Sequence, residues 1–233
     1  MTQGDPHIIF HHELTQGSEE WLQARRGLLT ASEMKLIISP KMLKPAKNDK
    51  SRAHLYELLA QRISGYIEPH YVGDDMLRGR DEEELAREVY EEQYAPVSQV
   101  GFITNSKWGF TIGYSPDGLV GDDGLIEAKS RRQKFQVETI LADEMPEDYV
   151  FQVQTGLLVS ERKWCDFISY CGGMPMFTKR VYPDAGIQAA ILEAATAFED
   201  EMRAKRLEYE ERLVTASDRL IPTERAIEQE ITI

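Results

Sequence analysis

Cysteine, histidine and long apolar runs are all scarce in this sequence of 233 residues. The two cysteines, Cys165 and Cys171, lie in one short segment that predicts a strand, and their even spacing places both on the same face. This pattern favours a pair of reduced core thiols over a disulfide or a zinc site, which would need further ligands nearby. The five histidines add no metal-ligand pattern, because three lie near the N-terminus and the other two are isolated.

No apolar run approaches the roughly 18 residues needed to span a bilayer. The N-terminus also lacks the basic start and long apolar stretch of a secretory signal. With 42% hydrophobic and 29% charged residues, the chain predicts a single globular domain over residues 1–233, with a core at about 18–213 and a polar tail over 214–233. We therefore expect a cytoplasmic protein with no membrane-bound segment.

Positive charge is in short supply, since the net charge is −13, whereas a nucleic-acid-binding domain usually has a basic surface. The distribution is uneven, however. Residues 25–62 carry nine Lys and Arg against three acids, and the acidic surplus falls in residues 74–92 and in the C-terminal third. The basic segment is either a phosphate-binding face on an acidic body or a solvated loop, and composition alone does not decide between them.

Helical and β-like patterns divide the chain. Residues 18–26 predict a helix capped by Ser18 and ended by Gly27, and Thr30 with Glu33 forms a capping-box pattern that opens a second helix through residue 38. Further helices are predicted over residues 52–64, from about Asp74 or Gly79 to Tyr94, over 135–158 with a break near Pro146, and over 184–213. Short runs over residues 99–104, 108–115 and 124–130 predict an antiparallel meander, followed by strands at 163–171 and 176–182. The order predicts a mixed α/β (α+β) domain.

The strongest local pattern is Ser115-Pro-Asp117, then nine intervening residues, then Glu127-Ala-Lys129. Residues 121–124 predict a hairpin-type turn between them, and residues two apart on a strand project to one face, so Glu127 and Lys129 point together toward Asp117. Two neighbouring carboxylates repel each other unless a cation lies between them. Oxygen ligands of this kind suit Mg²⁺, with the carbonyl of Ala128 as a further ligand. Lys129 would then orient a metal-bound water or neutralise developing charge.

The same pattern also has a plain structural interpretation. Asp-Gly at the end of a strand is a common turn, and alternating Glu and Lys is typical of an exposed strand face. The acidic helix predicted upstream adds a reason to favour the metal site, because Glu83 could turn inward and complete it. Glu82 and Glu84 cannot share that direction, since neighbouring helix positions diverge by about 100°.

Four blocks in order resemble the phage lambda exonuclease family, also called YqaJ-type viral recombinases. The first is Glu20-Trp-Leu-Gln-Ala-Arg-Arg-Gly-Leu-Leu-Thr-Ala-Ser-Glu33; the others are Ser115-Pro-Asp-Gly118, Glu127-Ala-Lys129 and Tyr149-Val-Phe-Gln-Val-Gln154. The resemblance implies a restriction-endonuclease-like fold of the PD-(D/E)xK class, with a mixed, mainly antiparallel sheet flanked by helices. It also implies a processive 5′-to-3′ exonuclease acting on the ends of double-stranded DNA, with two Mg²⁺ ions, for which Mn²⁺ can substitute.

The resemblance assigns roles by position. It makes Asp117, Glu127 and the Ala128 carbonyl metal ligands, Lys129 the residue that serves the nucleophilic water, and Glu83 the acid contributed by a helix. It places Arg25, Ser32 and Ser115 around the 5′-phosphate, and Tyr149 and Gln152 beside the active site. A wedge that separates the strands falls near Met76, where the family has leucine and where Leu77 is an alternative. A homotrimer, a phage or prophage origin and a partner that anneals single strands are implied in the same way.

The residues themselves, without the resemblance, do not decide whether Arg25 and Ser32 bind a phosphate. Ser32 would lie in the first turn of a helix, where free N–H groups and the helix dipole favour an anion, and Arg25 could contact that anion through two hydrogen bonds. Alternatively, Arg25 covers the helix end and Ser32 only caps. Two other functions remain as rivals: a sequence-specific endonuclease on the same fold, and a catalytically idle DNA-binding scaffold for recombination. The complete set of Asp117, Glu127 and Lys129 argues against the idle scaffold.

Overall fold

The structure is a computed structural model that describes residues 7–69 and 74–225. The side chains of residues 74–77 and of Arg80 also lie outside the description. Within the described part, no helix is both long enough and apolar enough to cross a membrane.

The first helices begin and end where the sequence carries capping residues. Helix α1 spans Glu19–Arg25, with the Ser18 hydroxyl accepting a hydrogen bond from the Trp21 N–H, and Gly27 follows at a φ of 67°. Helix α3 spans Asp49–Ser64, three residues longer at its start than predicted, because Asn48 caps it. Helix α4 spans Asp74–Gln93, as predicted.

The second predicted helix is much shorter than expected. Residues Ala31–Glu33 form a 3₁₀ turn (η1), and helix α2 covers only Met34–Ile37. The capping box does not form, because the Thr30 hydroxyl donates to the Glu33 carboxylate at 2.6 Å instead of capping a backbone N–H. The prediction that Ser32 lies in the first turn of an α-helix is therefore wrong, because Ser32 lies in the 3₁₀ turn.

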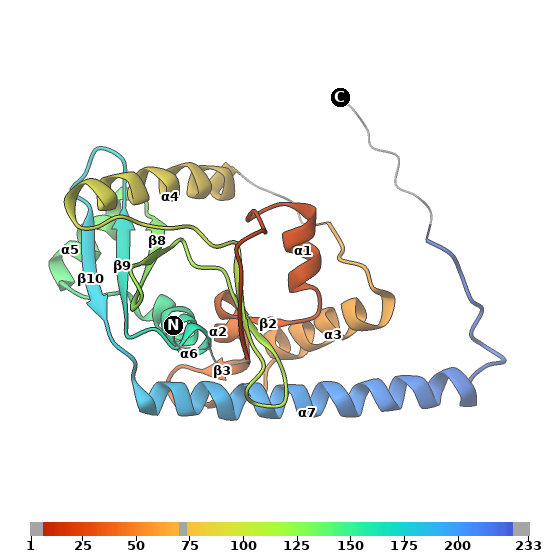
Figure 1. The fold of residues 1–233 in the computed structure, drawn as a ribbon. Coiled ribbons are helices and arrows are strands. Elements are labelled where there is room, and N and C mark those ends of the chain that lie inside the picture. The colour runs from red at the N-terminus through yellow and green to blue at the C-terminus, as the bar shows by residue number, and fades with distance from the viewer. Residues whose placement is uncertain (1–6, 70–73, 226–233) are drawn as a thin grey trace.

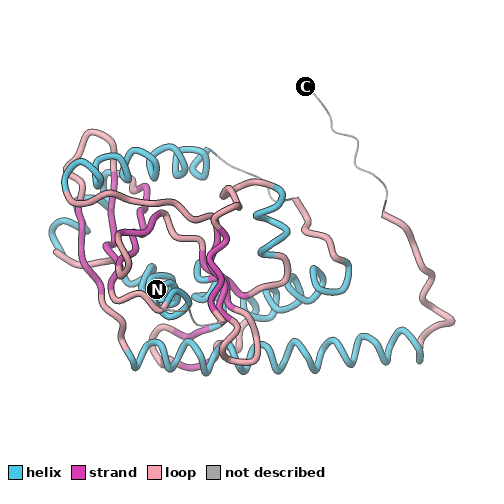
Figure 2. Tube along the Cα trace, viewed as in Figure 1, coloured by secondary structure: helices cyan, strands magenta, loops and turns pink. Residues whose placement is uncertain are grey.

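The strands form two four-stranded sheets and one small pair, and Figure 2 shows the magenta strands in separate groups with helices around them. The first sheet has the order β1-β5-β6-β2, with bounds Ile8–His11, Phe102–Asn105, Ile112–Tyr114 and Leu29–Thr30. The second has the order β10-β9-β8-β7, with bounds Phe177–Val181, Trp164–Tyr170, Gly124–Ser130 and Gly118–Val120. Strands β3 (Ile38–Ser39) and β4 (Lys44–Pro45) pair separately. Only β2–β6 and β8–β9 are parallel, so the sheets are mixed and mainly antiparallel.

The predicted meander over residues 99–130 is wrong in its connectivity. The chain leaves the first sheet after β6, passes through Pro116, and forms the short strand β7, which pairs with β8 in the second sheet. Only a single bridge between Ser98 and Leu119 ties the segment before β5 to β7. Because proline has no N–H to donate to a ladder, it favours a break at this point. The break places Tyr114 at the end of the first sheet and Asp117 just before the second, only three residues later.

Strand β8 is one of the two inner strands of the second sheet, and its first five residues are buried. It runs parallel to β9, with Glu127 opposite Phe167. Parallel neighbours need a crossover, which is supplied by α5 (Gln133–Ala142), the 3₁₀ turn η2 (Glu147–Tyr149) and α6 (Val150–Ser160). The predicted break near Pro146 separates α5 from η2. Helix α4 covers β8 and β9 from the other side (Figure 1).

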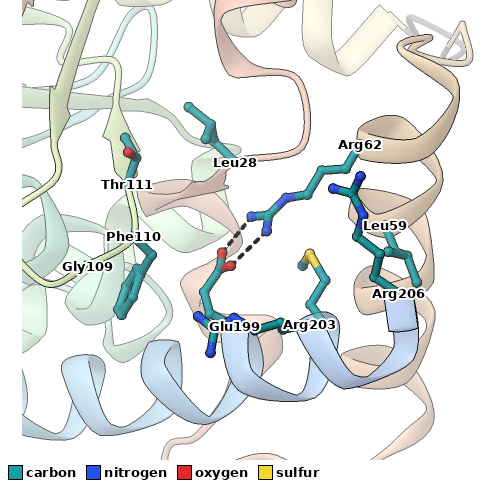
Figure 3. A pocket seen from close by; sticks show the side chains of 10 residues that line it. Leu28, Leu59, Arg62, Gly109, Phe110, Thr111, Glu199, Arg203 and Arg206 are labelled. Carbon is teal, nitrogen blue, oxygen red and sulfur yellow. Dashed lines mark hydrogen bonds and ion pairs between the residues drawn. The ribbon is translucent and has the colours of Figure 1, made fainter. Parts of the chain in front are cut away.

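The last helix, α7 (Ala185–Thr215), runs along the lower edge of the molecule in Figure 1 and extends beyond the other elements. Of its predicted apolar stripe, Ile191, Ala194, Phe198 and Met202 are buried and Ile187 is partly buried. Arg62 of α3 forms two hydrogen bonds, at 2.7 and 2.6 Å, with the buried carboxylate of Glu199, and it also donates to the Gly27 carbonyl. Both residues line a pocket of about 380 Å³, to which residues 109–111 also contribute. Figure 3 shows the pair joined directly, with Arg62 reaching from α3 to Glu199 on α7.

The basic segment is therefore partly structural, because Arg62 ties α3 to α7 and Lys44 pairs with Glu193. Cys165 and Cys171 are buried free thiols, as predicted.

Candidate active site

Asp117 and Glu127 come together across the β7–β8 hairpin. The ladder pairs Gly118 with Ile126, so continuing it by one residue places Asp117 opposite Glu127. The Asp117 carboxylate, just before the first residue of β7, accepts a hydrogen bond of 2.7 Å from the Ala128 N–H of β8. The hairpin therefore fixes one carboxylate by its backbone contact and presents the other from the neighbouring strand.

Glu127 is 1% exposed, and both of its oxygens accept hydrogen bonds. Oε1 accepts from Lys129 Nζ at 2.6 Å and from the Gln152 side-chain amide, while Oε2 accepts from the Tyr114 hydroxyl at 2.8 Å. A buried carboxylate needs partners of this kind, because an unpaired buried charge is strongly unfavourable. The three donors come from β8, α6 and β6, so several elements converge on one side chain.

The charges at the hairpin shift each other's pKa values. Burial and the negative charges of Glu127 and Glu83 raise the pKa of Asp117 well above its usual range, although Lys129 opposes this. Burial opposes the charged form of Lys129, but the carboxylates of Glu127, Asp117 and Glu83 outweigh it and raise the pKa of Lys129. Carboxylates that repel in this way form a site where an added cation is favourable.

The oxygen donors at the hairpin fit Mg²⁺. Asp117 and Glu127 supply carboxylates, and the Ala128 carbonyl points to the same edge of β8 as the N–H that binds Asp117. No group of three or more His, Cys, Asp and Glu side chains among the described residues is arranged to hold a metal ion. The candidate ligands are therefore the two carboxylates of Asp117 and Glu127 and the Ala128 carbonyl, with water molecules in the remaining positions. Mg²⁺ commonly binds in that way.

Helix α4 brings a third acid near the hairpin. Glu83 lies close enough to raise the pKa of Asp117, and both line a cleft of about 490 Å³ together with Trp21 and Arg87. Glu82 points elsewhere, as expected from its helical position, and accepts a hydrogen bond of 2.5 Å from the Ser130 hydroxyl. The proposed wedge residue Met76 belongs to the first turns of α4, but its side chain lies outside the described residues.

A second group of polar side chains surrounds Ser115, two residues before Asp117. The Ser115 hydroxyl accepts from Arg25 at 3.2 Å and from the Trp21 indole at 2.9 Å. Arg25 also donates to the Thr30 hydroxyl, which lies 3.3 Å from the hydroxyl of the exposed Ser32. Arg25, Ser32 and Ser115 thus form one network, joined through Thr30. Burial lowers the pKa of Arg25, opposed by Glu33, but arginine remains charged at any physiological pH.

Tyr149 lies on the other side of Lys129. Its ring centroid is 5.9 Å from Lys129 Nζ and stacks on Phe167 at 5.3 Å, while its hydroxyl accepts from Arg131 at 2.8 Å. The ring therefore forms a wall beside the lysine, and Gln152, one turn along α6, contacts Glu127 directly. Both residues therefore lie beside the hairpin.

The YqaJ-like viral recombinase domain matches residues 20–163. The crystal structure of an alkaline exonuclease (LHK-Exo) from Laribacter hongkongensis is 33% identical, with a TM-score of 0.75 over 86% of this chain and 100% of that one. The chain belongs to the YqaJ-like viral recombinase family.

Two further comparisons bear on the fold. LHK-Exo in complex with dAMP matches with 34% identity and the same TM-score and coverage. A phage related exonuclease from Haemophilus somnus, 13% identical with a TM-score of 0.53 over 76% of this chain and 96% of that one, supports the fold alone. No curated protein matches the chain. The predicted restriction-endonuclease-like fold and the predicted enzyme class are confirmed, since this YqaJ-like chain is homologous to an alkaline exonuclease.

Sequence reasoning missed two residues of this YqaJ-like site. Tyr114 was seen only as part of a β-like run, although its hydroxyl binds Glu127. Trp21 was part of the first block without an assigned contact, yet its indole N–H donates to the Gly101 carbonyl at 3.0 Å and to the Ser115 hydroxyl at 2.9 Å. Neither contact has a signal in local spacing, because each joins residues of separate elements. The polar end of each ring was the available hint, since buried Tyr and Trp usually find a hydrogen-bond partner.

Proposed function

We propose that this member of the YqaJ-like family is a Mg²⁺-dependent 5′-to-3′ exonuclease. Its substrate is the 5′-phosphorylated strand of linear double-stranded DNA, which it digests processively to 5′-mononucleotides. The remaining 3′ single strand would serve recombination by strand annealing. By resemblance to its family we also propose a homotrimer, an annealing protein as partner and a site of action in the cytoplasm of a bacterial host.

One observation carries the proposal. Ser115 contacts Arg25, and Asp117, two residues later, faces Glu127 and Lys129. A cation and hydroxyls suited to a terminal phosphate therefore lie beside oxygen donors suited to Mg²⁺. This adjacency favours attack near a chain end over attack at an internal position. LHK-Exo was solved with dAMP, and a mononucleotide is the class of product expected here.

The chemistry follows from the residues. When bound, Mg²⁺ would lower the pKa of a water and stabilise charge on the phosphate. Asp117, Glu127 and the Ala128 carbonyl would hold it, and Glu83 would add a further acid from α4. The Lys129 ammonium would orient the attacking water and neutralise the developing charge. Arg25 would bind the terminal phosphate through two hydrogen bonds, with Ser32 and Ser115 as further donors.

The test uses linear and closed circular duplexes, each incubated with Mg²⁺ or with a chelator, and the linear form with and without 5′-phosphate. We expect degradation only of linear DNA, faster with 5′-phosphate and abolished by chelation. Cutting of closed circles would favour the endonuclease alternative. Absence of cutting under every condition would favour the idle scaffold.

A further inference from the structure

Tyr114 connects the two sheets at the candidate active site. It is the last residue of β6 in the first sheet and is 1% exposed, whereas Glu127 belongs to β8 in the second sheet. Its hydroxyl donates to Glu127 Oε2 at 2.8 Å.

The Tyr114 ring has little freedom to move. Gly156 of α6 packs against it so closely that a Cβ at Gly156 would lie 2.6 Å from the ring carbon that carries the hydroxyl. On its own sheet, Tyr114 is held in register opposite Ile103. The position of the hydroxyl is therefore set by the packing of α6 against β6, on elements that do not belong to the metal-binding hairpin.

The two oxygens of Glu127 have different partners. Oε1 accepts from Lys129 and Gln152, and Lys129 is partly exposed. Oε2 accepts from Tyr114, which is buried in the core. The partners of Oε1 can therefore exchange for another ligand at the site, whereas the partner of Oε2 is fixed by close packing.

We propose that Tyr114 is a positioning residue, which holds Glu127 Oε2 in the core so that Oε1 is presented to a metal ion beside Asp117. The inference rests on the proposed metal-dependent function. Without the hydroxyl, the Glu127 carboxylate loses its only partner on Oε2 in the described contacts and can rotate away from the binding geometry. Groups that orient metal ligands in this way typically change metal affinity by about 10- to 100-fold when removed.

The test is Tyr114→Phe, which removes one hydroxyl from the core and leaves the ring. The matched control is Tyr90→Phe. Tyr90 is also 1% exposed and donates to a buried carboxylate, Asp166, at 2.6 Å, but that carboxylate is not among the proposed metal ligands. Both variants remove a buried phenol–carboxylate hydrogen bond, so a purely structural effect should be similar in the two.

Mn²⁺ binding to each protein without DNA is measured by titration with electron paramagnetic resonance of the free ion. We expect Tyr114→Phe to bind Mn²⁺ about ten-fold more weakly than wild type, and Tyr90→Phe to match wild type. DNA cleavage by Tyr114→Phe should need more Mg²⁺ and should recover at saturating Mg²⁺. Equal Mn²⁺ affinity in the two variants would overturn the positioning role.

If Tyr114→Phe does not fold, Gly156→Ala replaces it, because its methyl group pushes the ring while the hydroxyl remains. Unchanged Mn²⁺ affinity in that variant would also overturn the inference. A wild-type protein that binds no Mn²⁺ would instead contradict the proposed metal-dependent function, so the two failures are distinguishable.

Discussion

Lys129 and Glu127 form the ion pair on which the chemistry at the hairpin depends. Their charged atoms are 2.6 Å apart, and Glu127 is almost completely buried. Lys129 therefore has two functions in the account: it neutralises a buried carboxylate, and it is the cation available to the reacting phosphate. The first function concerns stability and the second concerns rate, so a substitution must be measured in both ways.

Lys129→Ala is expected to reduce the single-turnover cleavage rate by at least about 10²-fold, because a preorganised charge at the reacting group is lost. DNA binding, measured with Ca²⁺ in place of Mg²⁺, should remain close to wild type. Lys134→Ala is the control, since Lys134 is an exposed lysine on α5. A Lys129→Ala enzyme that cleaves as fast as the control would contradict the assigned role.

Arg25→Ala is expected to lower the ratio of the cleavage rates on phosphorylated and unphosphorylated 5′ ends by about ten-fold or more. The reason is that a hydrogen bond to a charged group contributes about 1.5–3 kcal/mol. The neighbouring Arg26 gives a matched control: it donates to Gln23 and to the Gly65 carbonyl and does not contact Ser115 in the described network. Initial rates on phosphorylated and unphosphorylated ends are compared for Arg25→Ala and Arg26→Ala. Equal loss in both variants, or no preference in wild type, would contradict the phosphate role.

The amount that sequence reveals differs between elements. Most helices were predicted close to their observed bounds, and so were the long strands β8 and β9, because capping residues and apolar periodicity are local signals. The short strands β1, β2, β3, β4 and β7 were not predicted. The connection from β6 to β7 was predicted wrongly, because the sheet that a short strand joins is decided by partners far away in the sequence. The failed capping box has a similar cause: the Thr30 hydroxyl has Arg25 and Glu33 as partners, and spacing alone cannot show which contact prevails. In the candidate site, motif residues were found and Tyr114 was not.

The ion pair between Arg62 of α3 and Glu199 of α7 gives a prediction about how these two helices are held together. Glu199→Ala removes one partner of a pair with two hydrogen bonds and leaves Arg62 without its carboxylate. Because breaking a buried ion pair costs about 3–5 kcal/mol and Arg62 is partly exposed, we expect a loss near 3 kcal/mol in the free energy of unfolding. Urea denaturation measures it.

Glu193→Ala is the control on the same helix, because it breaks the exposed pair with Lys44. Exposed pairs contribute about 0–1 kcal/mol, so this variant should unfold almost like wild type. If the two variants were destabilised equally, the Arg62–Glu199 pair would not be the main attachment of α7.

At the scale of the whole molecule, the chain combines a net charge of −13 with a cationic site at Arg25 and Lys129. An acidic surface discourages nonspecific binding along DNA, so affinity must come from a few specific contacts. The sequence already placed those cations within motifs. The fold adds their position, because Ser115 and Asp117 belong to one short connection between two sheets and so keep the proposed phosphate pocket beside the proposed metal donors.

Strand polarity on a single asymmetric duplex tests the central claim most directly. One strand carries a 5′-phosphate and the other a 5′-hydroxyl, and each has its own label at both the 5′ and the 3′ terminal nucleotide. With Mg²⁺, the account predicts release of the 5′-terminal label of the phosphorylated strand first, as a mononucleotide, while the 3′-terminal labels and the opposite strand are retained. Early release of a 3′-terminal label, or equal digestion of both strands, would contradict the proposal that this nuclease begins at a 5′-phosphate and digests one strand.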